Sequence, residues 1–140
     1  MSSIKFTLSE SESWDKLSQI WSCLSIGKQK GKIDREEMKK TLGSKLKIKF
    51  WSVEEASEIG KKWFEIPDQE RISHPEFFEK WDFESWLGAI EDAEVSLNEI
   101  VRKGNEGELL FEQFSQPSGG IDPLLFLIEI VDGRVISMDD

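Results

Sequence analysis

The sequence has very few of the residues that bind metals or serve as nucleophiles and bases. Its 140 residues include one cysteine, Cys23, and one histidine, His74. A single cysteine excludes an internal disulfide. Zinc sites need clusters of cysteine and histidine, and nucleophilic catalysis needs a serine or cysteine beside a base. We therefore predict no catalytic residues, no metal site and no cofactor.

Long apolar runs are also missing. No segment approaches the roughly 20 apolar residues that cross a bilayer, and the first five residues lack the apolar core of a signal peptide. The prediction is a soluble, cytoplasmic protein with no membrane partner. A hydrophobic content of 38%, with 6 Trp and 9 Phe, is enough for a packed core, and the chain length predicts a single domain over residues 1–140.

Two glycine-containing segments match ligand-binding loops only in outline. Residues 26–37 have the glycine and glutamate spacing of an EF-hand, but Lys28 and Lys30 stand where calcium needs oxygen ligands. The segment 118–120 precedes a helix start but lacks the glycine fingerprint of a nucleotide site, and the Asp122 carboxylate would occupy the helix N-terminus that an anion needs. Neither calcium nor a nucleotide is predicted.

The charges are divided unevenly along the chain. The net charge is −10, yet residues 28–49 contain nine basic and three acidic residues, a net charge of +6. The remaining residues therefore carry −16. Such an asymmetry can steer a charged partner, or the two parts can compensate each other within the fold.

Two segments before the C-terminal third alternate apolar and polar side chains, as half-buried strands do. They are residues 4–8 and residues 45–50. In the second strand Lys45, Lys47 and Lys49 would share one face, an arrangement typical of a soluble edge strand or of a basic ribbon.

The C-terminal part predicts a strand–helix–strand unit. A strand is predicted at residues 108–114 and a turn-rich loop at 115–120. An almost wholly apolar helix at 124–131 and a final strand at 134–138 follow. Asp122 is expected to cap the helix, and Gly133 to end it in the left-handed conformation. A right-handed crossover would leave the two strands parallel.

Helical periodicity and capping signals predict four further helices, near residues 10–27, 35–42, 53–65 and 83–100. Ser9 with Glu12 and Ser52 with Glu55 have the spacing of capping boxes. Gly88, inside the last helix, suggests a close approach of another backbone. The buried stripe of the third helix is expected to contain Ala56, Ile59, Trp63 and Phe64. The prediction is an α+β fold, with four or five helices on a three- or four-stranded sheet.

The exposed face of the helix at 83–100 is acidic. The sequence contains no predicted group of catalytic residues, and the domain is small, acidic and rich in tryptophan. These properties fit a non-enzymatic inhibitor that masks a basic surface of a protein partner, as bacterial immunity proteins and antitoxins do. The expected contact residues are Asp82, Glu84, Glu91, Asp92 and Glu94, together with any tryptophan at the surface.

Two other functions stay open. Lys45, Lys47 and Lys49 could contact a nucleic-acid backbone or an acidic partner, although the net charge of −10 does not favour nucleic acid. The other open function is an enzyme that uses carboxylates alone or with a metal, which would require a concave cluster of acidic residues.

Overall fold

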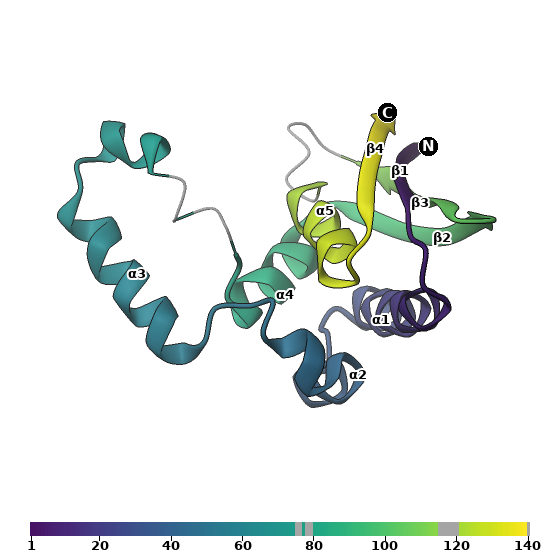
Figure 1. Ribbon diagram of the computed structural model, residues 1–140, viewed down its shortest axis with the longest axis horizontal. Helices are drawn as coiled ribbons and strands as arrows, with labels where there is room; N and C mark the ends of the chain where they lie inside the picture. The colour runs from purple at the N-terminus through teal and green to yellow at the C-terminus, as the bar shows by residue number, and fades with distance from the viewer. Residues whose placement is uncertain (75–76, 78–79, 115–120, 140) are drawn as a thin grey trace.

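A computed structural model describes residues 1–74, 77, 80–114 and 121–139. The predicted loop at 115–120, including Ser118, Gly119 and Gly120, lies outside the described residues. The elements are β1 (Ser2–Thr7), α1 (Ser11–Lys30), α2 (Arg35–Lys47), α3 (Val53–Glu65), the 3-10 helix η1 (Asp68–Ser73), α4 (Phe83–Asp92), β2 (Val95–Lys103), β3 (Glu106–Gln113), α5 (Ile121–Ile130) and β4 (Arg134–Asp139) (Figure 1).

The four strands form one antiparallel sheet in the order β2-β3-β1-β4. Since β3 and β4 each pair antiparallel with β1, they run in the same direction but are separated by the N-terminal strand. Alternation along β1 buries Ile4 and Phe6 completely and leaves Lys5 exposed. Helix α1 contacts β2, α5 contacts β4, and α4 contacts both helices, so the core lies between the helices and one face of the sheet. The predicted α+β class is confirmed.

The predicted strand at 45–50 is wrong. Helix α2 runs to Lys47, with one break at Gly43, where φ is 72° and ψ is 172°. Leu46 and Phe50 are buried, whereas Ile48 is 71% exposed. In a strand Ile48 would share the buried face with Leu46 and Phe50, so its exposure contradicts the alternating pattern.

The predicted long helix at 83–100 is also wrong beyond its third turn. Helix α4 ends at Asp92, and β2 begins at Val95. The register of β2 against β3 shifts between Leu97 and Glu99. This bulge inserts one residue and puts Leu97 and Ile100 on one face, a spacing of three that imitates a helix.

One of the two predicted capping boxes is present. At the start of α3, the Glu55 amide donates to Ser52 Oγ at 3.1 Å, and the Ser52 amide donates to Glu55 Oε1 at 3.0 Å. At α1 the N-cap is Glu10, without a capping hydrogen bond from a side chain, so the box at Ser9 is wrong. Helix α5 begins at Ile121, which places Asp122 in its first turn.

The C-terminus of α5 differs from the prediction by one residue. Asp132, not Gly133, adopts the left-handed conformation, with φ of 63°. The Gly133 amide donates to the Ile128 carbonyl at 2.9 Å and the Asp132 amide to Glu129 at 3.0 Å, which is a Schellman motif. Gly133 is required by packing instead, because a Cβ there would lie 2.8 Å from Ile128 Cγ2.

Two helical glycines have opposite surroundings. Gly27 does not end α1, which continues to Lys30 and closes at Gly31. A Cβ on Gly27 would lie 2.7 Å from the Cα of Ile33, whereas a Cβ on Gly88 would meet nothing within 4 Å. The close backbone approach predicted at Gly88 therefore occurs at Gly27.

This contrast gives a matched pair of variants. Gly27→Ala is expected to lower the free energy of unfolding by about 2 kcal/mol, because the added methyl overlaps a fixed backbone. Gly88→Ala is expected to raise it by about 1 kcal/mol, because alanine is the better helix former and space is available. Urea denaturation checks both. Changes of the same sign in the two variants would contradict the described surroundings.

Helix α3 and η1 project from the rest of the molecule (Figure 1). We call residues 53–73 the arm and the remaining described residues the body. Neither α3 nor η1 contains a buried residue, and Phe64 is 82% exposed. The predicted buried stripe of α3 is therefore wrong. At the base of the arm, the Trp51 amide donates to the Trp81 carbonyl at 3.0 Å and holds the two ends together.

Within the described residues, no helix combines the length and the apolar character needed to span a bilayer.

Candidate functional site

The five predicted acidic contact residues do not form one free surface. Asp82 is the N-cap of α4 and accepts a hydrogen bond from the Ser85 amide at 3.0 Å. Asp92 and Glu94 are exposed at the opposite end of the helix, about 15 Å away from the rise of a ten-residue helix. Glu84 and Glu91 lie between them and pair with a basic residue of the same chain.

That basic residue is Arg35. Its guanidinium donates to both carboxylate oxygens of Glu91, through Nη1 and, at 3.0 Å, through Nη2. Arg35 Nε also lies 3.1 Å from Glu84 Oε2, and the Ile33 amide donates to Glu91 at 2.7 Å. These hydrogen bonds from Arg35 lower the pKa of the Glu91 carboxyl and, in turn, raise the pKa of Arg35. Glu91 thus holds the start of α2 against α4.

Lys28 places a positive charge at the C-terminal end of α4. Its ammonium donates to the carbonyls of Ile90 and Ala93, at 2.9 and 2.6 Å, and so caps the C-terminus of the helix. Burial lowers the pKa of Lys28, and the carboxylates of Asp92 and Glu91 oppose that change. The basic segment and the acidic helix, far apart in the sequence, therefore neutralise each other in part.

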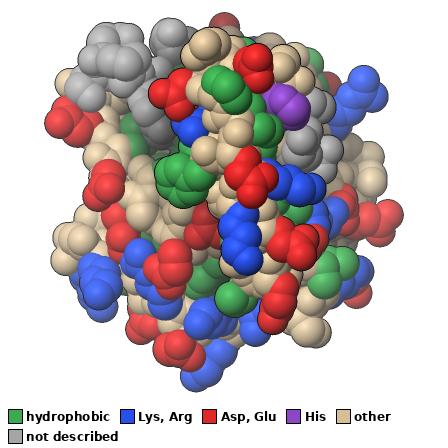
Figure 2. All heavy atoms as spheres, turned by 90° about the vertical axis from the view of Figure 1, so that its left-hand side faces the viewer, with side chains coloured by type: hydrophobic (Ala, Val, Ile, Leu, Met, Phe, Trp, Pro, Cys, Tyr) green, Lys and Arg blue, Asp and Glu red, His purple; other side chains and the backbone are tan. Residues whose placement is uncertain are grey.

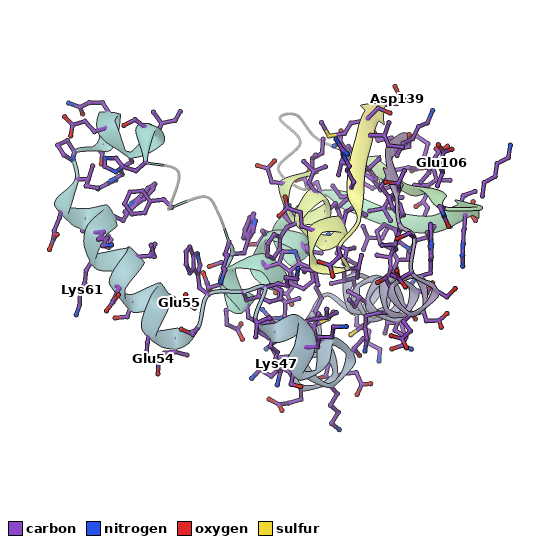
Figure 3. The ribbon with its side chains drawn as sticks, viewed as in Figure 1. Lys47, Glu54, Glu55, Lys61, Glu106 and Asp139 are labelled. Carbon is purple, nitrogen blue, oxygen red and sulfur yellow. The ribbon has the colours of Figure 1, made fainter. Side chains whose placement is uncertain are left out.

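The three lysines of the alternative site are not aligned. Lys45 and Lys47 are exposed on the last turn of α2, where two residues of separation turn the side chains to different sides (Figure 3 labels Lys47). Lys49 lies beyond the helix and pairs with Asp132 at 2.5 Å. Because the strand that would have aligned them is absent, the geometry does not favour a basic ribbon.

A groove of about 580 Å³ separates the arm from the body. Four parts of the chain contribute to it: Trp51, which precedes α3, then α3 itself, the segment that precedes α4, and α5. Figure 2 shows the side of the molecule from which the arm projects, where hydrophobic, acidic and basic side chains are interspersed. The groove is lined by Trp51, Ala56, Ile59, Gly60, Trp63, Phe77, Lys80, Trp81, Asp82, Asp122, Leu125, Phe126 and Glu129.

The tryptophans divide into two groups. Trp14, Trp21 and Trp86 are buried in the body, while the other three are partly exposed, and all three line the groove. Two of these rings carry cations of the chain: Lys80 Nζ lies 5.3 Å from the Trp51 ring, and Arg71 lies 4.6 Å from the Trp63 ring. The aromatic surface of the groove therefore already accepts cationic groups.

Carboxylates border this aromatic surface. Asp82, one of the contact residues predicted from the sequence, lies on the rim. Asp122 and Glu129 of α5 lie there too, although neither was predicted as a contact residue. Asp122 and Glu129 are exposed. Asp122 and Glu129 are seven residues apart, which is two helical turns, so they lie on the same side of α5. This spacing is the sequence signal that could have predicted their proximity.

Reactive groups are sparse in the part of the chain that the structure describes. No three side chains of His, Cys, Asp or Glu lie close enough there to hold a metal ion. Cys23 is half-buried, and burial, helped by the carboxylates of Glu37 and Asp34, raises the pKa of its thiol. The His74 ring lies 5.8 Å from that of Phe77. The groove has aromatic walls, and three carboxylates and Lys80 line it.

Comparison with protein-family models, curated protein sequences and solved structures found no match to this chain.

Proposed function

We propose that this chain is a non-enzymatic binding protein, an inhibitor of the immunity-protein or antitoxin type, and that it covers a basic surface of a protein partner with the groove. The observation that carries the proposal is the gathering of three partly exposed tryptophans beside three carboxylates. Tryptophan is enriched among the residues that dominate binding energy at protein interfaces. Acidic residues around such a centre favour a cationic partner and accelerate its association.

The proposal moves the contact surface from the outer face of α4 to the groove. Asp82 belongs to both surfaces. Glu91 is excluded because Arg35 and the Ile33 amide already occupy its oxygens. Asp92 and Glu94 lie at the far end of α4, where they add to the negative field without touching a partner in the groove.

The test is affinity capture followed by binding to the purified partner. The double variant Asp122→Lys with Glu129→Lys reverses the charge of two of the three rim carboxylates. Its effects on the stability of α5 offset each other, because the two changes lie at opposite ends of the helix dipole. We expect binding to weaken by at least about tenfold at low salt. Asp82 is left unchanged because it caps α4.

The matched control is Glu54→Lys with Glu58→Lys, the same change of charge on residues of α3 outside the groove. Figure 3 shows Glu54 and Lys61 pointing away from the body. We expect the control to retain the partner and to inhibit the partner's own activity as the wild type does. Equal retention by the rim variant, or a partner that binds without losing activity, would contradict the proposal.

A further inference from the structure

The two edges of the sheet differ in how they are protected. At one edge, β2 ends in the exposed charges Arg102 and Lys103, which hinder pairing with another strand. At the other edge, β4 carries charges only at its two ends. Between them, Ile136 and Met138 are each 54% exposed. In the described part of the chain, β4 pairs only with β1.

The sequence of β4 is complementary to itself when read antiparallel. With the strand Arg-Val-Ile-Ser-Met-Asp opposite a second copy, Arg134 faces Asp139, Val135 faces Met138, and Ile136 faces Ser137. Each copy supplies both halves of every pair. The register therefore gives one ion pair at each end and an apolar pair next to it, the combination that stabilises antiparallel neighbours.

We propose that a second copy of this chain pairs with β4, forming a symmetric dimer with one continuous eight-stranded sheet. The two-fold axis passes between Ile136 and Ser137, so the interface is the same surface on both subunits. The inference is independent of the groove, because no residue of β4 lines it.

Two features of β4 agree with this arrangement. Ile136 is the extra residue of a bulge against β1, since Lys5 pairs with Ser137 and Phe6 with Val135. Because of this bulge, Arg134 and Asp139 lie on one face of the sheet and Val135 and Met138 on the other, as residues that face each other in an antiparallel pair must. Asp139 forms a long ion pair with Lys5, at 3.9 Å, and its carboxylate is 67% exposed, so it can reach a second partner. Figure 3 shows Asp139 at the free end of the strand.

Sedimentation velocity of charge-exchange variants tests the pairing. The full chain is expected to be a dimer at concentrations on the order of 100 μM and to dissociate on dilution, because an interface of one short strand is small. Arg134→Asp alone places like charges opposite each other at both ends of the pair, and so does Asp139→Arg alone. Each variant is expected to lose the dimer.

An equimolar mixture of these two variants is expected to regain the dimer, because opposite charges then face each other at both ends. Lys103→Asp on the β2 edge serves as the control and should leave the dimer unchanged. Circular dichroism shows whether each variant is folded. A spin label at Ser137→Cys, in a Cys23→Ser background, gives a second readout that needs no charge change, since coupling between two labels should vanish on dilution.

A monomeric wild type at all concentrations would overturn the proposal. So would a dimer that persists equally in both single variants, because it would place self-association on another surface.

Discussion

Trp86→Ala is expected to lower the free energy of unfolding by about 4 kcal/mol, within the range for a buried tryptophan. The Trp86 ring has no exposed surface, and it lies 5.3 Å from Phe50 and 6.5 Å from Phe126. Its Nε1 donates to the Pro123 carbonyl at 2.9 Å, and this buried acceptor would lose its partner. The ring joins α4, α5 and the turn that follows α2, so its removal opens a cavity where three segments meet.

Urea denaturation followed by far-ultraviolet circular dichroism measures this loss. Trp51→Ala is the matched control, because it deletes the same atoms from a partly exposed site in the groove. A loss below about 1.5 kcal/mol is expected there. Similar losses in the two variants would show that Trp51 belongs to the core and would contradict the division of the tryptophans.

Glu91→Ala is expected to lower the free energy of unfolding by about 2 kcal/mol at neutral pH. The change removes the carboxylate that accepts from the Ile33 amide and pairs with Arg35. Both side chains of the ion pair are largely shielded, with 21% and 16% of their surfaces exposed. Glu84→Ala is the control, because Glu84 is 65% exposed, and a change within about 0.5 kcal/mol is expected.

The effect of Glu91→Ala should depend on pH with a defined sign. Hydrogen bonds from Arg35 lower the pKa of Glu91 in the folded state, relative to about 4.3 in an unfolded chain. The stability that Glu91 contributes is therefore complete above that unfolded value and is lost as the pH falls through the lowered folded value. The difference between wild type and variant should stay constant from about pH 7 to pH 5 and narrow below about pH 4. A difference that grows with acid would contradict the ion pair.

Local patterns predicted most of the sheet and the ends of several helices. The alternation that buries Ile4 and Phe6 placed β1, and the capping box at Ser52 placed the start of α3. The same rules failed where two periods coincide. Leu46, Ile48 and Phe50 alternate as in a strand, although α2 runs to Lys47 and Ile48 is exposed, and the bulge in β2 gives Leu97 and Ile100 a helical spacing.

The candidate site depended on contacts that no local pattern contains. Lys28 and Ile90 are separated by 62 residues, and Arg35 and Glu91 by 56. Their pairing decides how much of the acidic surface is free. The groove draws its tryptophans from the arm and from both sides of its base, so its existence depends on the direction in which α3 leaves the body. Composition indicated tryptophan and acid as binding residues, but only the fold brings them together.

The closed base of the arm has a consequence for how this chain can change over evolutionary time. The hydrogen bond between Trp51 and Trp81 brings the arm's entry and exit together, and the arm supplies no residue to the buried core. Substitutions within residues 53–73 are therefore not constrained by the packing of the body. One wall of the groove can diversify while the opposite wall, on α5, is held by the core. Such a division would let a lineage follow a changing partner without losing its fold.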